Sequence, residues 1–246
     1  MLSQYHAGAC VVSTPRSAIV TGAFGVLGAA VAHRLSLDGT RVALIDVAPE
    51  VPKALRTELG DGHLYRSGVD LTDLAATRSV FDQVAQRFDG LDVLVNVAGG
   101  FRWERVADGG LETWDQMYSI NLRTAVVACK AALVALTRRG GGRIVNVGAG
   151  AAGKAAAGMG AYTASKAGVQ RLTESLAAEL RDANITVNAI LPGTIDTPRN
   201  RADMPDADFS RWVAPDDIAD VIAFLVSDSA VAVTGAAIPV FGRGWS

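Results

Sequence analysis

The chain has 246 residues, half of them hydrophobic, and a formal net charge of −2 at pH 7. This length and composition can bury a full core and are typical of one α/β domain. The nearly balanced charge, with no basic cluster, argues against a nucleic-acid surface. The apolar stretches are interrupted before the roughly 20 residues that a membrane span needs, which argues against a membrane protein.

Cysteine and histidine are too few and too scattered for a metal site or a disulfide framework. Cys10 and Cys129 lie far apart and have no metal-like partners. We therefore expect no metal and a reducing, cytoplasmic location. Residues 1–16 lack the basic start and long apolar core of a signal peptide, and we expect a flexible N-terminal tail followed by a single domain over 17–246.

The first predicted unit is a strand over 17–21, a tight turn and a helix over 26–38. Glycines at positions 22, 25 and 28 occupy the turn. Glycines there let the backbone approach a pyrophosphate, and the helix that follows offers unpaired N–H groups and its positive dipole end. This pattern predicts a dinucleotide-binding turn.

A second predicted strand, over 41–46, ends in Asp46. An acid at this distance beyond the glycines binds the adenosine ribose diol, although it could also be a turn residue at a strand end. A carboxylate repels the 2′-phosphate of NADP(H). The next residue is Val47, so no arginine is present there to bind that phosphate. NAD(H) is therefore favoured, and NADP(H) stays possible.

Further strands and helices alternate through the rest of the chain. Strands are predicted over 64–69, 92–96, 143–148, 185–190 and 237–240, and helices over 73–88, 113–138, 161–182 and 215–227. The strands are apolar with little alternation, as expected when helices cover both faces. This order predicts a Rossmann-type, doubly wound parallel sheet of about seven strands. The irregular stretch over 192–212 is predicted to be a mobile lid.

Tyr162 and Lys166 lie four residues apart in a predicted helix, so that their side chains share one face. A nearby ammonium group can bring the pKa of a phenol within reach of neutral-pH proton transfer. The pair is therefore interpreted as an acid–base device. The alternative is a packed ring beside a solvated charge.

Together these motifs resemble the short-chain dehydrogenase/reductase superfamily over residues 17–244. The resemblance rests on the glycine turn, Asp70 after the third strand, NVAG at 96–99, Asn121, the Tyr162–Lys166 pair and PGTIDT at 192–197. It implies that Tyr162 donates or accepts a proton, that Lys166 binds the nicotinamide ribose and lowers the pKa of Tyr162, and that Asn121 holds a relay water.

The resemblance also implies a set of cofactor-binding residues. These are Thr21, Gly22, Gly25, Val26, Leu27 and Gly28 at the pyrophosphate, Asp46 at the ribose, Asp70 and Leu71 at the adenine, Asn96, Ala98 and Gly99 on the cofactor floor, Tyr162 and Lys166 at the nicotinamide ribose, and Pro192, Gly193, Ile195 and Thr197 at the carboxamide.

Two positions depart from the family pattern. Val26 stands where the middle glycine is expected, which leaves the turn intact but shifts its phosphate contacts. Ala149, thirteen residues before Tyr162, stands where most members carry the serine that binds the substrate carbonyl. No serine or threonine occurs between Arg143 and Tyr162. Loss of one such oxyanion donor costs about a hundred- to a thousandfold in rate.

A serine-less site favours substrates whose developing charge is spread over a conjugated ring. GAGAA at 148–152 and IDTPRNRADMPDADFSRW at 195–212 resemble quinonoid dihydropteridine reductase, which also keeps the tyrosine and lysine without the serine. The first hypothesis is therefore hydride transfer to a small carbonyl or conjugated C=N substrate of dihydropteridine type.

Two alternatives stay open. One is a general carbonyl or 3-oxoacyl thioester (acyl-carrier-protein) reductase in which a water or Asn121 replaces the serine. The other is an NAD-binding regulatory protein with little turnover. An intact Tyr162, Lys166 and Asn121 argue against the latter, because a silent binder needs no proton relay.

The substrate side and the assembly are predicted from apolar residues. The candidate substrate contacts are Ala149, Phe101, Trp103, Met204, Phe209 and Trp212, and the aromatic ones could equally anchor their loops.

The helices over 113–138 and 161–182 carry more small and apolar residues than one buried face requires. A homodimer or homotetramer is therefore expected.

Overall fold

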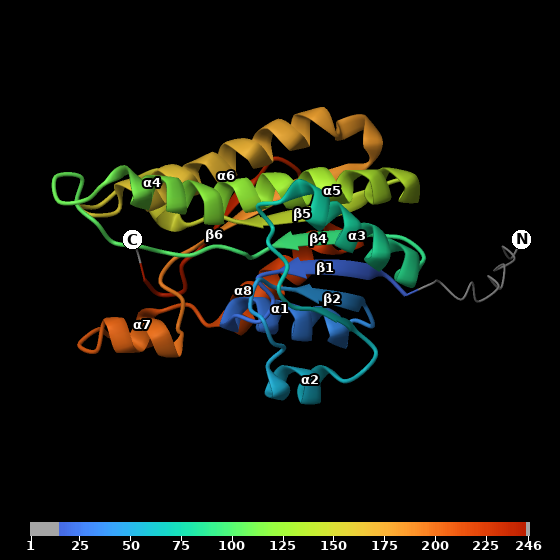
Figure 1. Cartoon of the computed structure of the whole chain (residues 1–246), viewed down its shortest axis with the longest axis horizontal. Helices are drawn as coiled ribbons and strands as arrows, with labels where there is room; N and C mark the ends of the chain where they lie inside the picture. Colours follow the sequence, from blue (N-terminus) through green and yellow to red (C-terminus); the bar gives the residue numbers. More distant parts are fainter. Residues whose placement is uncertain (1–14, 245–246) are drawn as a thin grey trace, which may run out of the picture.

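The structure of the protein is a computed structural model that describes residues 15–244. Its seven strands form one parallel sheet in the order β3-β2-β1-β4-β5-β6-β7, with helices on both faces (Figure 1). The predicted single-domain α/β fold is thereby confirmed. The strands are β1 (Ser17–Thr21), β2 (Arg41–Ile45), β3 (Leu64–Arg66), β4 (Val93–Asn96), β5 (Gly142–Val147), β6 (Ile185–Pro192) and β7 (Ala237–Val240).

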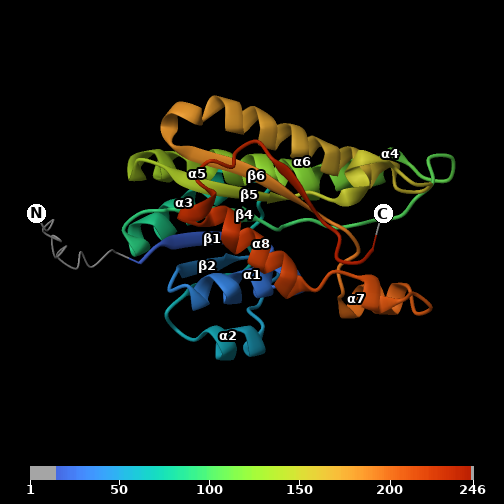
Figure 2. The same cartoon turned by 180° about the vertical axis from the view of Figure 1, so that it is seen from behind.

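The helices lie in two layers. The α-helices are α1 (Val26–Leu37), α2 (Lys53–Leu59), α3 (Leu74–Phe88), α4 (Leu111–Met117), α5 (Thr124–Arg139), α6 (Gly160–Glu179), α7 (Pro198–Asp203) and α8 (Pro215–Val226). Helices α1 and α8 cover one face of the sheet, and α3, α5 and α6 cover the other (Figures 1 and 2). This arrangement explains why the strands are apolar on both sides.

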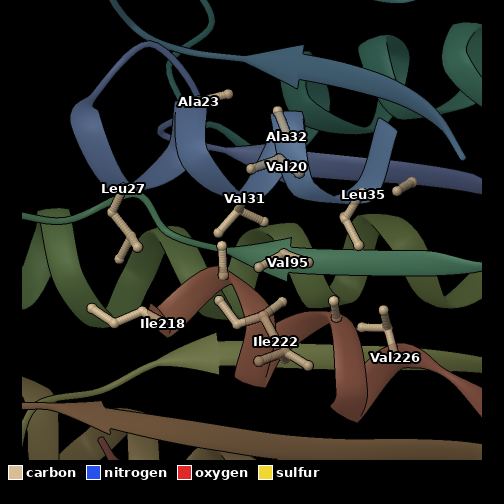
Figure 3. Close-up of a cluster of buried hydrophobic side chains, with 14 of the residues drawn as sticks. Val20, Ala23, Leu27, Val31, Ala32, Leu35, Val95, Ile218, Ile222 and Val226 are labelled. Carbon is tan, nitrogen blue, oxygen red and sulfur yellow. The ribbon is translucent and has the colours of Figure 1, made fainter. Parts of the chain in front are cut away.

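The core beneath α1 and α8 fixes the helix that follows the glycine turn. Val31 and Leu35 of α1, one turn apart, meet Ile218 and Ile222 of α8 above the sheet (Figure 3). Helix α8 begins with Pro215 and has Asp216 and Asp217 in its first turn, both favourable at a helix N-terminus. The start of α1 is thereby anchored at the edge of the sheet.

The predicted helix over 113–138 differs from the observed structure. It comprises α4, a π-helical segment at Tyr118–Arg123 and then α5. Periodicity did not reveal the inserted turn, because the apolar pattern continues on both sides of it. Such π-helical turns often mark functional sites, and this one contains Asn121.

A strand end, a short helix and the lid segment also differ from the predictions. Strand β3 ends at Arg66 rather than at residue 69, and α2 was not predicted. The stretch predicted as an irregular lid over 192–212 begins inside β6, which ends at Pro192, and contains α7 and a 3-10 turn at Phe209–Arg211. Short helices of this kind carry too few periodic residues to be recognised from sequence.

The chain on either side of the domain is described only in part. Residues 1–14 of the predicted tail lie outside the described residues. Arg16 lies directly before β1, and its carbonyl accepts a hydrogen bond from the Arg41 N–H at 2.8 Å.

The continuous helical run Leu111–Arg139 is long and apolar enough to cross a membrane, by length and composition alone. Half of its most apolar window is buried inside the protein, as in the core helix of a soluble domain.

Candidate functional site

The predicted site residues gather at the carboxyl ends of the parallel strands. Thr21 ends β1, Asn96 ends β4 and Val147 ends β5, and α4 and α7 both lie beyond this edge of the sheet (Figures 1 and 2). In open α/β sheets ligands bind at this edge, near the point where the strand order reverses. The reversal here lies between β1 and β4.

The glycine turn forms a cradle that side chains could not enter. Gly22 has a φ of +61°, and a Cβ atom there would lie 2.7 Å from the backbone N of Ala98. A Cβ atom on Gly28 would lie 2.2 Å from the Gly22 carbonyl oxygen. Helix α1 has Gly25 at its N-cap, with no side chain bound to its first N–H groups. The turn therefore fits a pyrophosphate, as predicted for a dinucleotide.

Thr21 and Val26 lie at the two ends of the segment that joins β1 to α1. The Thr21 hydroxyl accepts hydrogen bonds from the N–H groups of Val97 and Ala98 at 3.2 and 3.3 Å, so it ties β1 to the loop after β4. Val26 is 47% exposed in the first turn of α1. The departure from glycine at this position therefore leaves the turn intact.

Asp46 lies beside the glycine turn. Its carboxylate accepts hydrogen bonds from the N–H groups of Phe24 and Ala48, both at 3.0 Å. The negative charge is thereby held where the predicted adenosine ribose would lie. Val47 is 68% exposed and provides no cation for a 2′-phosphate.

Asp70 and Leu71 form the predicted adenine side. Asp70 accepts hydrogen bonds from the backbone N–H and the hydroxyl of Thr72, at 2.8 and 2.7 Å, and these bonds lower the pKa of its carboxyl. Leu71 is buried in the apolar cluster beneath α3 and α5. The Asp70 side chain is thus fixed by its own loop.

The side chain of Asn96 points into the protein. Its amide nitrogen donates to Asn146 Oδ1 at 2.9 Å and to Cys129 Sγ at 3.3 Å, and the residue is 4% exposed. The prediction that Asn96 lines the cofactor floor is therefore limited to its backbone. A polar residue at a strand end cannot be assigned to one face from sequence, because the chain turns there.

Gly99, Asn121 and Lys166 meet at the centre of the site. A Cβ atom on Gly99 would lie 2.6 Å from Asn121 Oδ1 and 3.2 Å from Lys166 Nζ. Asn121 Oδ1 accepts from the Gly100 N–H at 2.9 Å, and its Nδ2 donates to the Gly100 carbonyl at 3.1 Å and to Ser165 Oγ at 3.0 Å. These polar atoms of Asn121 thus have protein partners, and the relay water stays a prediction.

Tyr162 and Lys166 share one face of α6, yet burial moves their pKa values in opposite directions. Burial raises the pKa of Tyr162 to about 12 and lowers the pKa of Lys166 to about 8. The Lys166 ammonium group donates to the Val147 carbonyl at 2.8 Å. The predicted lowering of the Tyr162 pKa by Lys166 is absent in the protein alone, because desolvation dominates there.

Phe101 contacts the candidate catalytic tyrosine. The two rings meet edge to face, with centroids 4.9 Å apart and planes at 87°. Phe101 is 52% exposed, so one side of its ring is open to solvent. Trp103 lies two residues further, and its indole N–H donates to the Ala157 carbonyl at 3.0 Å. The structure thus brings one of the predicted substrate contacts against Tyr162.

The other predicted substrate residues lie in the lid, here defined as residues 194–213. Phe209 and Trp212 pack on each other at 4.7 Å, and the Arg201 guanidinium lies over the Phe209 ring. Met204 is 41% exposed. Among the described residues, these aromatic contacts of the lid stay within the lid, so its role at the substrate stays a prediction.

The predicted carboxamide side joins β6 to the lid. Pro192 is the last residue of β6, and the Gly193 N–H donates to the Val240 carbonyl at 3.0 Å. The Thr197 hydroxyl accepts from the Asn200 N–H at 3.1 Å and caps α7. Ile195 pairs with Val213 at the base of the lid. Phe241, which the sequence analysis missed, packs against Gly150 and Gly193.

Ala149 is 5% exposed and is the N-cap of a 3-10 turn at Gly150–Gly153. This turn follows β5 and precedes α6, which carries Tyr162. The position therefore lies at the edge of the sheet that holds the other predicted site residues.

The rest of the described chain offers no candidate metal site but includes a surface hollow. Among residues 15–244, no group of three His, Cys, Asp or Glu side chains could hold a metal ion. A surface hollow lies between α3 and α5, lined by residues such as Arg78, Asp82 and Ala135. It contains none of the predicted site residues.

Comparison with known proteins identifies the family of the chain. A family model described as short chain dehydrogenase matches residues 16–208. A D-threitol dehydrogenase of Mycolicibacterium smegmatis is 35% identical over 236 residues, which cover 92% of this chain and 91% of the relative. A cis-4-hydroxycyclohexanecarboxylate dehydrogenase of Sinomonas cyclohexanicum is 36% identical over 241 residues, which cover 92% and 95%.

Solved structures of similar proteins hold nicotinamide cofactors. An NAD+-bound xylitol dehydrogenase has a TM-score of 0.85 and 29% identity, with coverage of 94% of this chain and 99% of that chain. A 3-ketoacyl-(acyl-carrier-protein) reductase from Brucella melitensis, complexed with NADH, has a TM-score of 0.83 and 28% identity, with coverage of 93% and 98%. With its parallel sheet, glycine cradle and Tyr162–Lys166 pair, the chain belongs to the short-chain dehydrogenase family of oxidoreductases.

Proposed function

We propose that the protein is an NAD(H)-dependent reductase of a small, ring-bearing substrate with a conjugated C=N or C=O group, of dihydropteridine type. When bound, the cofactor would supply the hydride that adds to the substrate carbon. Tyr162 gives its phenolic proton to the substrate nitrogen or oxygen, and solvent then restores that proton. Lys166 and Asp46 hold the two riboses, and the turn at Gly22 and Gly28 holds the pyrophosphate.

The observation that carries this proposal is the absence of a hydroxyl side chain between Arg143 and Tyr162, where Ala149 is buried. A ketone develops its negative charge on one oxygen and needs a donor there. A conjugated ring spreads that charge over several atoms. The missing donor therefore harms a conjugated substrate less than a simple ketone.

The ring contact at Tyr162 favours the same substrate class. Phe101 meets Tyr162 edge to face and leaves part of its ring exposed. Aromatic side chains that present an open edge or face pack well against flat rings. Burial keeps Tyr162 protonated at neutral pH but also makes its phenol a weaker acid, so this pKa shift favours neither direction of the reaction.

The cofactor preference rests on Asp46. Its carboxylate is held beside the turn, and no arginine follows at position 47. NADH is therefore the proposed cofactor, and NADPH is the weaker binder.

A second candidate is oxidation or reduction at a simple alcohol or ketone carbon. It is favoured by the relatives, which include dehydrogenases of D-threitol and of a hydroxycyclohexanecarboxylate, and by the likeness to a 3-ketoacyl-(acyl-carrier-protein) reductase. In this case a water or Asn121 replaces the missing serine. An NAD-binding protein with little turnover is the third alternative.

Steady-state assays with four substrates separate these candidates. We expect NADH oxidation with quinonoid dihydropterin to exceed that with acetoacetyl thioester, and NAD+ reduction with threitol and with cyclohexanols to be slow. Faster turnover of the polyol, cyclic alcohol or thioester would establish the second candidate instead. NADH binding without turnover of any of them would favour the regulatory protein.

The variant Ala149→Ser tests the missing donor directly. It should accelerate ketone reduction by about a hundredfold and leave turnover of the conjugated substrate unchanged. Ala152→Ser, which adds a hydroxyl in the adjoining 3-10 turn, is the matched control. If Ala149→Ser changes neither rate, position 149 does not face the reacting carbonyl and the argument from it is wrong.

Assembly and location complete the proposal. Helices α5 and α6 are rich in alanine, and helix faces of small residues pack closely against a second copy. A homodimer or homotetramer is therefore proposed. Equilibrium sedimentation would measure the number of subunits. Cys129 is a buried free thiol, and a reducing cytoplasm is the proposed location.

A further inference from the structure

Ser165 lies in α6, three residues after Tyr162 and next to Lys166, and it is 4% exposed. Its hydroxyl donates to the Tyr162 carbonyl at 2.7 Å and accepts from Asn121 Nδ2 at 3.0 Å. Both hydrogen-bonding directions of this hydroxyl are therefore used. It joins the backbone of the candidate catalytic residue to a side chain from another element.

Asn121 extends this link to the loop after β4. Its amide pairs with both the N–H and the carbonyl of Gly100, at 2.9 and 3.1 Å. Gly99, the neighbour of Gly100, approaches Asn121 and Lys166 too closely for any side chain. A chain of hydrogen bonds thus runs from the cofactor floor through Asn121 and Ser165 to Tyr162.

The π-helical turn gives Asn121 its place in this chain. The turn at Tyr118–Arg123 adds a residue to the helix, and Asn121 is 1% exposed within it. Helix interiors seldom bury an asparagine unless its amide has partners. Ser165 and Gly100 are those partners, from two different elements.

We propose that Ser165 is a positioning residue for the reaction: its hydroxyl fixes the backbone of Tyr162 relative to Asn121 and the Gly99–Gly100 floor. The inference rests on the proposed role of Tyr162 as proton donor. A displacement of about 1 Å at a reacting group can lower a rate a hundredfold. Loss of the link should therefore lower kcat while the cofactor still binds.

The test compares Ser165→Ala, Ser165→Cys and Ser165→Thr. Alanine removes the hydroxyl, and cysteine keeps the volume but is a weak donor and acceptor. Both should lower kcat about ten- to a hundredfold, without change in the KM for NADH. Threonine should restore kcat, because Thr163 and Thr173 already donate to carbonyls four residues earlier in the same helix.

Thr173→Val is the matched control. It removes a buried hydroxyl from α6 that bonds Asn146 and the Val169 carbonyl, away from Asn121. It should lower the melting temperature and leave kcat unchanged. A double variant of Asn121→Ala and Ser165→Ala should lose no more activity than Asn121→Ala alone, because the two residues act through one link.

Two results would overturn the inference: a wild-type kcat in Ser165→Ala, or a failure of threonine to restore a rate that alanine and cysteine both lower. If Ser165→Ala fails to fold, the cysteine and threonine variants decide the question. Tyr162→Phe separates this inference from the proposed function. If that variant keeps full activity, the proposed function fails; if it is inactive while Ser165→Ala is normal, only the role of Ser165 fails.

Discussion

The cofactor floor and the substrate rim are built in contrasting ways. We use the first name for Gly22, Gly28, Gly99, Asn121 and Lys166. A Cβ atom on Gly22 or Gly28 would meet neighbouring backbone, and one on Gly99 would meet the Asn121 and Lys166 side chains. The rim consists of Phe101, Trp103 and the lid, whose aromatic side chains are partly exposed. Phe101 contacts Tyr162, Trp103 donates to the Ala157 carbonyl, and Phe209 and Trp212 pack on each other. The floor is therefore specified by close contacts at glycines, whereas the rim is specified by partly exposed side chains.

This contrast explains how one family serves many substrates. Changes in the floor would disturb the packing at the ends of the strands, where the dinucleotide and the proton donor are proposed to lie. Changes in the rim alter only the surface that the substrate meets. The following experiments test whether the two regions respond as differently as their packing indicates.

The largest effect should come from Gly28→Ala. Its Cβ atom would lie 2.2 Å from the Gly22 carbonyl, so the turn must shift. NADH affinity, measured by fluorescence titration, should fall more than about a hundredfold, since pyrophosphate contacts through the backbone are lost. Gly62→Ala, at a glycine with open space around it, should bind normally. Normal binding by Gly28→Ala would show that the floor is less constrained than the contacts indicate.

A double change at the ribose end should reverse the cofactor preference. Asp46→Ser with Val47→Arg removes the carboxylate and adds a cation for a 2′-phosphate. The ratio of the NADPH and NADH dissociation constants should fall by about a hundredfold, equivalent to roughly 2.7 kcal/mol. If the wild type already binds NADPH more tightly, the role given to Asp46 is wrong.

The buried ammonium of Lys166 should make the stability of the cofactor-free protein depend on pH. Its pKa is about 8 in the folded protein and 10.5 in its ordinary state, so between these values the unfolded chain holds the proton and the folded chain does not. Stability should therefore rise from pH 8 to pH 10. Above pH 10 the raised pKa of Tyr162 should lower the stability, because the phenol ionises in the unfolded chain before it ionises in the folded protein.

Lys166→Met isolates this contribution. The difference in unfolding free energy between wild type and variant should change by about 1–3 kcal/mol from pH 8 to pH 10, measured by urea denaturation. Lys130→Met, at an exposed lysine of α5, should show no such change. A flat difference for Lys166→Met would mean that water reaches the ammonium group.

The smallest effect should come from the rim. Phe101→Ala removes the edge-to-face contact with Tyr162, which is worth about 0.5–1.5 kcal/mol beyond its buried area. The KM for the substrate should rise a few-fold to about tenfold, and NADH affinity should stay unchanged. Val106→Ala, at an exposed residue of the same loop, is the control. A loss of NADH affinity in Phe101→Ala would place Phe101 in the floor.

The contrast also explains what the sequence could predict. The parallel sheet of about seven strands followed from alternating apolar and helical segments, and the glycine turn and Asp46 were predicted from their spacing along the chain. The orientation of Asn96, the π-helical turn at Asn121 and the bond to Ser165 depend on residues 21 to 50 positions apart. Only the folded chain brings these together.

The lid leaves the domain and returns to it at almost the same point. The Asp196 N–H donates to the Val213 carbonyl at 2.9 Å, and the Val213 N–H donates to the Thr194 carbonyl at 3.0 Å. The segment between these residues is a loop whose two ends are joined by backbone hydrogen bonds. Such a segment could be exchanged between relatives, by recombination or in the laboratory, while the sheet beneath it keeps its registry.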